Sequence, residues 1–285
     1  MLYLVIVSLL WAPSFGLVAH YLKGVDPNFV AAARILLSLL VFAPLMRLRG
    51  LPAKQVLALL ALGALQFGLM YVLYLQSFRW IRGVEAALFT VFTPLLVTLF
   101  DDLLQRRISW LFLATASLTV AGTAVIQWTE LERDGLLIGF VLMQLSNACF
   151  ALGQVLYRKL APATGKSDPQ LMGTMYAGAA IVACAAAILS FQPATLANLK
   201  RDQILVLLYL GAIASGLGFF LFNAGARKVN VGALAIFNNV KVPLAVLASV
   251  LVFGDPVSWP RLMIGGAIIG MALILNEKLP RRAVS

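Results

Sequence analysis

Charged side chains are scarce in this sequence of 285 residues, since Asp, Glu, Lys and Arg together make up only 12% of it. Hydrophobic residues make up 62%, and the mean hydropathy is +0.95. Soluble domains carry about 25% charged residues, so this chain has too little polar surface to cover a globule in water. The scarcity excludes an ordinary soluble protein and indicates that membrane lipid is its solvent.

Histidine, cysteine and nucleotide-binding motifs are also scarce or missing in the sequence. His20 is the only histidine, and few acidic residues fall inside apolar segments, which disfavours the metal site or acid–base pair of a membrane enzyme. Cys149 and Cys184 lie far apart in apolar segments and are expected to be core residues. The pattern Gly-x-x-x-x-Gly-Lys-Ser/Thr does not occur. We therefore expect neither an enzyme, nor ATP-driven transport by this chain, nor a cofactor.

Apolar segments separated by short charged or Pro/Gly-containing breaks run through the whole sequence. Each is close to the ~20 residues that an α-helix needs to cross the hydrocarbon. The pattern predicts an all-α integral membrane protein with ten transmembrane helices. These are expected near residues 2–20, 27–46, 55–78, 84–100, 108–128, 135–157, 170–191, 203–226, 229–252 and 259–277.

Basic residues give the chain a net charge of +11, but they lie mainly in the gaps between apolar segments. With the N-terminus in the cytoplasm, 13 of the 22 Lys and Arg residues fall in inside loops and 7 in outside loops, while Arg34 and Lys241 fall within spans. This excess follows the positive-inside rule. It predicts two cytoplasmic termini and a membrane lipid environment, and no nucleic-acid partner.

The two halves of the sequence match each other at nearly constant offsets. At an offset of 149, Pro94 matches Pro243 and Trp110 matches Trp259, and at an offset of 148, Arg79 matches Arg227. Five spans per repeat is an odd number, so the second copy must cross the membrane in the opposite sense. The sequence predicts two inverted five-helix repeats, residues 1–134 and 135–285, an arrangement common in secondary transporters.

Motifs in both halves resemble the drug/metabolite transporter superfamily, and its EamA-type members in particular. They are Trp11 with Ser14-Phe15, Pro27 with Arg34, and Phe253-Gly254-Asp255 followed by Gly265-Gly266 and Gly270. Further motifs resemble the bacterial biotin transporters of this family, and they include Met70-Tyr71, Thr93-Pro94-Leu95, Gln144-Leu145-Ser146-Asn147, Phe150-Ala151, Asn238-Asn239 and Pro243. Lys241 departs from the histidine of those transporters.

The resemblance implies a secondary transporter that imports biotin across the bacterial inner membrane by alternating access. It leaves open an exporter of amino acids or other small metabolites, because similar EamA-type proteins carry different solutes. Biotin has a carboxylate, a ureido ring that donates and accepts hydrogen bonds, and an apolar bicyclic face. Its site should therefore combine a cation, amides and aromatic rings.

Two cations lie at membrane depth. Lys241 is about 18 Å along its predicted helix, near the midplane, where a charged residue costs about 2.5–3.5 kcal/mol unless it faces a cavity or a partner. Its candidate partner is a substrate carboxylate, and the alternative is a structural cation held by carbonyl or amide groups. Arg34 is expected either to guide an anion inward or to hold two helices together.

Amides and aromatic residues complete the candidate site. Polar amides inside spans either contact the ureido ring or bond between helices. The candidates are Asn147, Gln144, Asn238 and Asn239, with Gln66 and Asn223 as weaker ones. The aromatic candidates are Trp11, Tyr71 and Phe150, followed by Phe15, Tyr74 and Phe219, which either enclose the bicyclic ring or pack in the core.

Single residues are the candidates for energy coupling and for hinge motion. Glu85 opens the fourth predicted span and is a candidate coupling group for protons, with an ion pair to Arg79 or Arg82 as the alternative. Pro94 and Pro243 lie at equivalent positions and remove helix hydrogen bonds, so both are candidate hinges.

Overall fold

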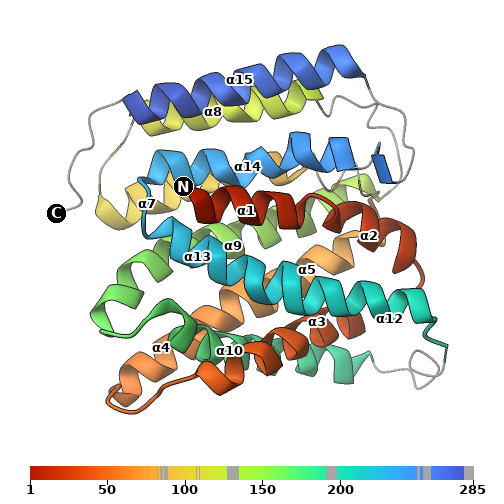
Figure 1. Cartoon of the computed structure of the whole chain (residues 1–285), viewed down its shortest axis with the longest axis vertical. Helices are drawn as coiled ribbons and strands as arrows, with labels where there is room; N and C mark the ends of the chain where they lie inside the picture. The colour runs from red at the N-terminus through yellow and green to blue at the C-terminus, as the bar shows by residue number, and fades with distance from the viewer. Residues whose placement is uncertain are drawn as a thin grey trace.

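The computed structural model consists of helices that lie side by side with roughly parallel axes (Figure 1). It describes residues 1–81, 83, 86, 89–106, 108, 110–126, 135–190, 198–248, 251–252 and 258–278. In chain order the elements are α1 (Leu2–Trp11), α2 (Ser14–Tyr21), α3 (Pro27–Phe42), η1 (Ala43–Leu45), α4 (Ala53–Gly63), η2 (Ala64–Leu69), α5 (Met70–Ser77), η3 (Thr90–Phe92), α7 (Thr93–Gln105), α8 (Trp110–Ile126), α9 (Leu136–Ala163), α10 (Asp168–Leu189), α12 (Arg201–Leu208), η4 (Tyr209–Leu217), α13 (Gly218–Ala226), α14 (Val231–Ala248) and α15 (Trp259–Lys278).

Six helical segments in the described part are long and apolar enough to cross a membrane. They are Leu2–Tyr21, Pro27–Leu45, Ala53–Ser77, Leu136–Ala163, Asp168–Leu189 and Arg201–Ala226. The helices α7, α8, α14 and α15 overlap the other four predicted segments, and α7 extends past the predicted end at residue 100 to Gln105. The all-α fold agrees with the sequence, whereas the count of ten spans stays a prediction.

The first predicted helix is divided in two. Pro13 follows α1 and directly precedes α2, and its ring nitrogen has no hydrogen to donate to the helix ladder. Trp11, Ser14 and Phe15 therefore lie at a helix junction, where the chain can direct their side chains into the bundle.

Two long segments contain π-helical stretches, η2 and η4, at places that correspond in the two halves of the sequence. A π-helix bonds residues five apart, which widens the turn, and such stretches are frequent at functional sites. Both stretches include buried polar residues, Gln66 in η2 and Ser215 in η4. Hydrophobic periodicity alone does not predict this local change in helix type.

Helices α3 and α10 pack against each other in opposite directions. Ser190 at the end of α10 bonds to Asp26 at the start of α3, whereas Arg47, just after α3, donates its backbone N–H to Gln170 in the first turn of α10. Each contact joins the start of one helix to the end of the other. The two helices are therefore antiparallel.

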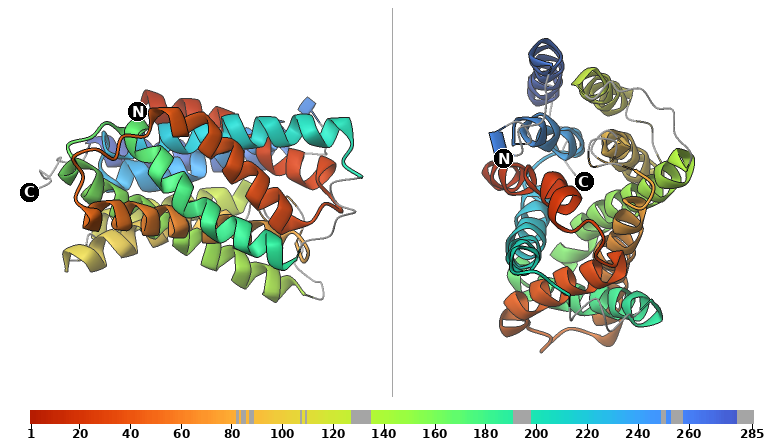
Figure 2. Two further views of the ribbon diagram at one scale, coloured as in Figure 1. Left: turned by 90° about the horizontal axis from the view of Figure 1, so that it is seen from below. Right: turned by 90° about the vertical axis from the view of Figure 1, so that its right-hand side faces the viewer.

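Helices α8 and α15 form a pair at one edge of the molecule (Figure 2). The backbone of Gly265 approaches Gly122 closely, while much of the outer face of α15 consists of exposed apolar side chains such as Met263 and Ile274. Exposed apolar side chains of this kind are compatible with lipid.

Candidate functional site

A cavity of about 80 Å³ lies among the helices. Residues from seven segments of the chain line it, namely Trp11, Ser14, Phe15, Arg34, Met70, Tyr71, Tyr74, Thr90, Ser146, Asn147, Phe150, Phe219 and Lys241. Both predicted cations are in this set. Ligand sites typically measure about 300–1,000 Å³, so a ligand the size of biotin requires the side chains or helices around this cavity to move apart.

Lys241 is the cation on α14, and only 7% of it is exposed. Its Nζ lies 5.2 Å from the ring centroid of Trp11 and 6.0 Å from that of Phe150. Within the described residues it has no carboxylate partner. Aromatic faces compensate an ammonium group by about 0.5–2 kcal/mol, less than an ion pair in such a place can supply. The cavity therefore favours an anion beside Lys241.

Trp11 is fixed by a hydrogen bond as well as by packing. Its Nε1 donates to the carbonyl oxygen of Ala214 in η4 at 2.7 Å, and its ring stacks on Phe222 at 5.1 Å between centroids. A Cβ at Gly218 would come within 2.6 Å of Nε1, so this glycine leaves room for the indole. The indole is thereby held as one wall of the cavity, under the Lys241 ammonium.

Arg34 on α3 is 3% exposed and links three helical segments. Its Nε donates to Ser215 Oγ at 3.1 Å and its Nη2 donates to Tyr71 OH at 2.6 Å. The guanidinium carbon also lies 4.4 Å from the centroid of the Tyr71 ring. Of the two roles expected for Arg34, these contacts supply the helix-joining one, while its place in the cavity wall is compatible with the other.

Asn147 and Gln144 both lie on α9 and share one backbone acceptor. Each amide donates to the carbonyl oxygen of Phe89, Asn147 at 2.8 Å and Gln144 at 2.9 Å, and Asn147 also donates to Gln144 Oε1. Asn147 lines the cavity and Gln144 does not. Gln144 therefore orients Asn147 in this conformation.

Asn238 and Asn239 do not line the cavity, although both are fully buried. Asn238 exchanges two hydrogen bonds with Gln154, at 3.2 and 3.1 Å, and Asn239 donates to the carbonyl oxygen of Val91 at 2.9 Å. Gln66 and Asn223 form a similar reciprocal pair. These amides join helices in this conformation, so a contact with a solute would require their present bonds to break.

Three small polar residues of the cavity wall were not among the candidate site residues, although two of them belong to the family motifs. Ser14, Thr90 and Ser146 line it, and Ser14 Oγ is buried with no hydrogen-bond partner in the described part of the chain. Ser146 donates to the carbonyl oxygen of Met70 at 2.9 Å. Ser and Thr are common in membrane helices, so type and depth alone do not distinguish these from the rest.

A larger cavity of about 700 Å³ lies next to the first one. Val18, Leu75 and Phe78 line it, and they lie about one helical turn beyond Phe15, Tyr71 and Tyr74 of the small cavity, respectively. The rings of Phe15, Tyr74 and Phe78 contact each other in sequence, with centroids 6.3 and 5.1 Å apart. Phe15 and Tyr74 line the small cavity and Phe78 lines the larger one, so this row of rings connects the walls of the two cavities.

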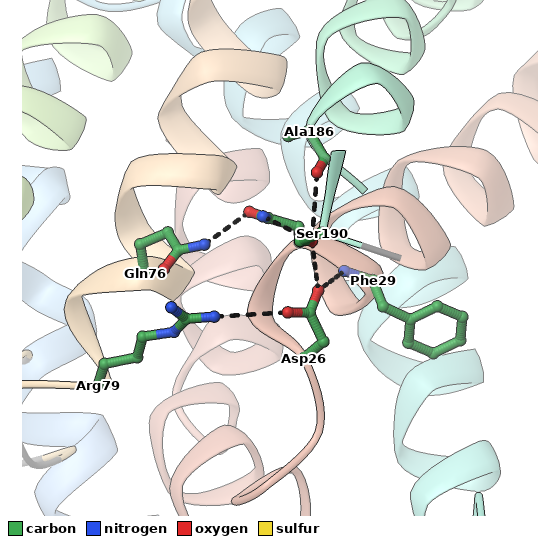
Figure 3. A network of polar contacts seen from close by, with 7 residues as sticks. Asp26, Phe29, Gln76, Arg79, Ala186 and Ser190 are labelled. Carbon is green, nitrogen blue, oxygen red and sulfur yellow. Dashed lines mark hydrogen bonds and ion pairs between the residues drawn. The ribbon is translucent and has the colours of Figure 1, made fainter. Parts of the chain in front are cut away.

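A polar network surrounds Asp26 at the wall of the larger cavity (Figure 3). Asp26 accepts from the backbone N–H of Phe29 at 2.9 Å and from Ser190 Oγ at 3.1 Å, and forms an ion pair with Arg79 at 3.4 Å. Gln76 reaches the same network through Asn28. The network joins the start of α3 to the ends of α5 and α10.

The remaining predicted residues have different outcomes. Glu85, the candidate coupling group, lies outside the described residues. Pro94 is the second residue of α7, directly after the 3-10 turn η3, whereas Pro243 lies inside α14. The two prolines therefore interrupt their segments differently, and their role as hinges stays a prediction.

This helical architecture around a small polar cavity is found in a known class of transport proteins. The EamA-like transporter family matches the chain twice, over residues 1–128 and 137–276. The chain therefore belongs to the EamA-like transporter family, and it is a multi-pass membrane protein. A solved crystal structure of a protein that is 20% identical aligns with this chain at a TM-score of 0.79. The alignment covers 99% of this chain and 98% of that protein's chain, which shows a shared fold.

Relatives of this chain include named biotin transporters. It is 42% identical to a probable biotin transporter of Pseudomonas aeruginosa, over 100% of this chain and 99% of that protein. It is 36% identical to the biotin transporter of Salmonella typhimurium, over 98% of this chain and 94% of that protein. It is 35% identical to the biotin transporter of Escherichia coli K12, over 96% of this chain and 92% of that protein. The chain is thus an EamA-type protein similar to biotin transporters over its whole length.

Proposed function

We propose that this protein imports biotin across the bacterial inner membrane as a secondary transporter. The observation that carries the proposal is Lys241, a buried cation without an acidic partner in the described residues, in a cavity that also has the amide of Asn147 and the rings of Trp11 and Phe150. These groups match the carboxylate, ureido ring and bicyclic face of biotin. Full-length relatives named biotin transporters support the same solute.

Alternating access between two inverted repeats, residues 1–134 and 135–285, is the proposed mechanism. The antiparallel α3 and α10 support it, because they are the second helices of the two halves, and so do the corresponding π-helical stretches. The start of α1 and the end of α15 both point to the left side of Figure 1, which supports two termini on one side of the membrane. We place both in the cytoplasm on the basis of the loop charges.

Uptake of labelled biotin by a bacterium that lacks its own biotin transporter tests the proposed function. Cells that express the protein should accumulate label several-fold faster than cells with an empty vector. No uptake despite membrane expression would contradict the proposal. Faster loss of preloaded amino acids, without biotin uptake, would instead favour an exporter of small metabolites.

Proton coupling is part of the proposal, because biotin is an anion and its entry opposes an inside-negative potential by about 2.3 kcal/mol per 100 mV. We expect a protonophore to lower the initial rate of biotin uptake several-fold in cells that express the protein. A rate that does not respond to the protonophore would indicate facilitated diffusion.

Ion pairs at the two ends of the α3–α10 pair supply candidate locks for the mechanism. Asp168, which opens α10, accepts from Tyr157 OH and pairs with Arg227 at 2.6 Å. Asp168 and Asp26 lie at the starts of α10 and α3, and Arg227 matches Arg79 in the sequence repeat. The Asp26–Arg79 pair is longer, at 3.4 Å, with 53% of the arginine side chain exposed. Since the larger cavity adjoins Asp26 and Arg79, we propose that this conformation is open there and locked at Asp168.

Asp168→Asn should therefore slow biotin uptake by about tenfold. A charge-assisted hydrogen bond contributes about 1.5–3 kcal/mol, so its loss shifts the equilibrium between the two conformations by at least about tenfold. Initial uptake rates, normalised to the amount of protein in the membrane, measure the effect. Asp202→Asn, at an exposed acid in the first turn of α12, is the matched control and should transport like the wild type. Equal rates for both variants would remove Asp168 from the mechanism.

A further inference from the structure

The π-helical stretch η4 is held in place by side chains of other helices. Trp11 from α1 donates to the carbonyl oxygen of Ala214, and Tyr176 OH from α10 lies 2.9 Å from the carbonyl oxygen of Ser215. A helix with a widened turn is stable where neighbouring groups satisfy its backbone. The position of Ser215 is thus fixed from two sides before any ligand binds.

The hydroxyl of Ser215 has its proton directed away from Arg34. Ser215 Oγ donates to the carbonyl oxygen of Leu210, five residues earlier, at 2.6 Å, a distance that the π-helical turn brings about. The oxygen is therefore left as an acceptor, and it receives Arg34 Nε at 3.1 Å and Tyr71 OH at 2.9 Å. Tyr71 OH, which donates to Ser215, is in turn free to accept from Arg34 Nη2.

One nitrogen of the Arg34 guanidinium makes no hydrogen bond to the described residues. Two hydrogen bonds and the Tyr71 ring fix the plane of its guanidinium, while Nη1 is buried and has no hydrogen-bond partner within the described residues. Arg34 lines the same small cavity as Lys241. A buried donor of a charged group without a partner costs free energy, which an anionic ligand can recover.

We propose that Ser215 is a positioning residue that holds Arg34 for the carboxylate of the solute, so that Arg34 and Lys241 together select a carboxylated ligand over its neutral analogue. The inference rests on the proposed function and deepens it. Ser215 itself does not line the cavity, so it acts through Arg34 alone. A site held ready in this way loses less conformational entropy on binding.

Binding of biotin and of biotin amide, its uncharged analogue, to the purified full-length protein tests the inference. The wild type should bind biotin more tightly than the amide. Ser215→Ala should raise the Kd for biotin by about tenfold, corresponding to one hydrogen bond to a charged group, and change the Kd for the amide less than about twofold. Ser215→Thr, which keeps the acceptor, should retain the preference. A purely structural role would weaken both ligands alike.

Ser38→Ala provides a matched control. Ser38 is fully buried one turn from Arg34 and bonds to the carbonyl oxygens of Arg34 and Gly211, so it contacts α3 and η4 without touching the guanidinium. Its variant should leave the ratio of the two Kd values unchanged. If Ser215→Ala does not fold, Ser215→Cys keeps the number of side-chain atoms with a weak acceptor and should show the same loss.

The outcomes separate the inference from the function on which it rests. Wild-type protein that binds neither ligand would contradict biotin transport itself. The positioning role alone would be overturned if the wild type prefers biotin and the Ser215→Ala or Ser215→Cys variant keeps the full preference. It would also be overturned if the variant loses affinity for both ligands equally.

Discussion

Lys241→Ala is expected to raise the Kd for biotin by at least about 100-fold. Removing one partner of a buried hydrogen-bonded charge pair costs about 2–5 kcal/mol, which corresponds to roughly 30-fold to several thousand-fold in affinity. The loss of affinity for Lys241→Ala should lie in the upper part of this range, because only 7% of Lys241 is exposed and the described residues offer it no carboxylate. Equilibrium binding of labelled biotin to purified protein measures the change.

Lys200→Ala is the matched control for this prediction. Lys200 lies just before α12, is exposed, and carries the same charge at a distance from the cavity. Its variant should bind biotin like the wild type, which shows that net charge alone is not responsible. Lys241→Arg should retain part of the affinity, since it keeps the charge but changes the shape of the donor. Unchanged binding by Lys241→Ala would place the carboxylate elsewhere.

The two cations and several aromatic rings that line the cavity could be selected from the sequence for a physical reason. A charged residue at membrane depth must face a cavity or a partner, so Arg34 and Lys241 could be selected from position alone. The motifs around Trp11 and Phe150 added two rings of the wall. These residues lie together in the structure, while their contact with biotin stays a proposal.

The sequence was less informative about amides and about local helix type. Asn147, Asn238 and Asn239 all lie inside predicted spans and have the same side-chain chemistry, but only Asn147 lines the cavity. Helical periodicity fixes which residues share a face, but not which neighbouring helix that face meets. The role of Ser215 depends on a π-helical turn that is held by Trp11 and Tyr176, and such long-range contacts are not encoded in any local pattern.

Close backbone contact between α4 and α10 leads to the second large effect. Small residues on a helix face allow the backbone of a neighbouring helix to approach closely. A Cβ built on Gly63 would lie 1.8 Å from the carbonyl oxygen of Met175, and one on Gly178 would lie 2.0 Å from that of Leu60. Each glycine thus faces the backbone of the other helix, which cannot move aside as a flexible side chain can.

Gly178→Ala is therefore expected to lower the free energy of unfolding by about 3 kcal/mol or more, at the upper end of the range for overpacking. Thermal unfolding of purified protein in detergent measures the loss, together with its yield as a monodisperse species. Gly266→Ala in α15 is the control, because a Cβ there meets no atom of the described residues within 4 Å. The melting temperature of this variant should equal that of the wild type or lie slightly above it, since alanine favours the helix by about 1 kcal/mol relative to glycine. If Gly178→Ala kept the wild-type melting temperature, α4 and α10 would have to lie farther apart than these contacts place them.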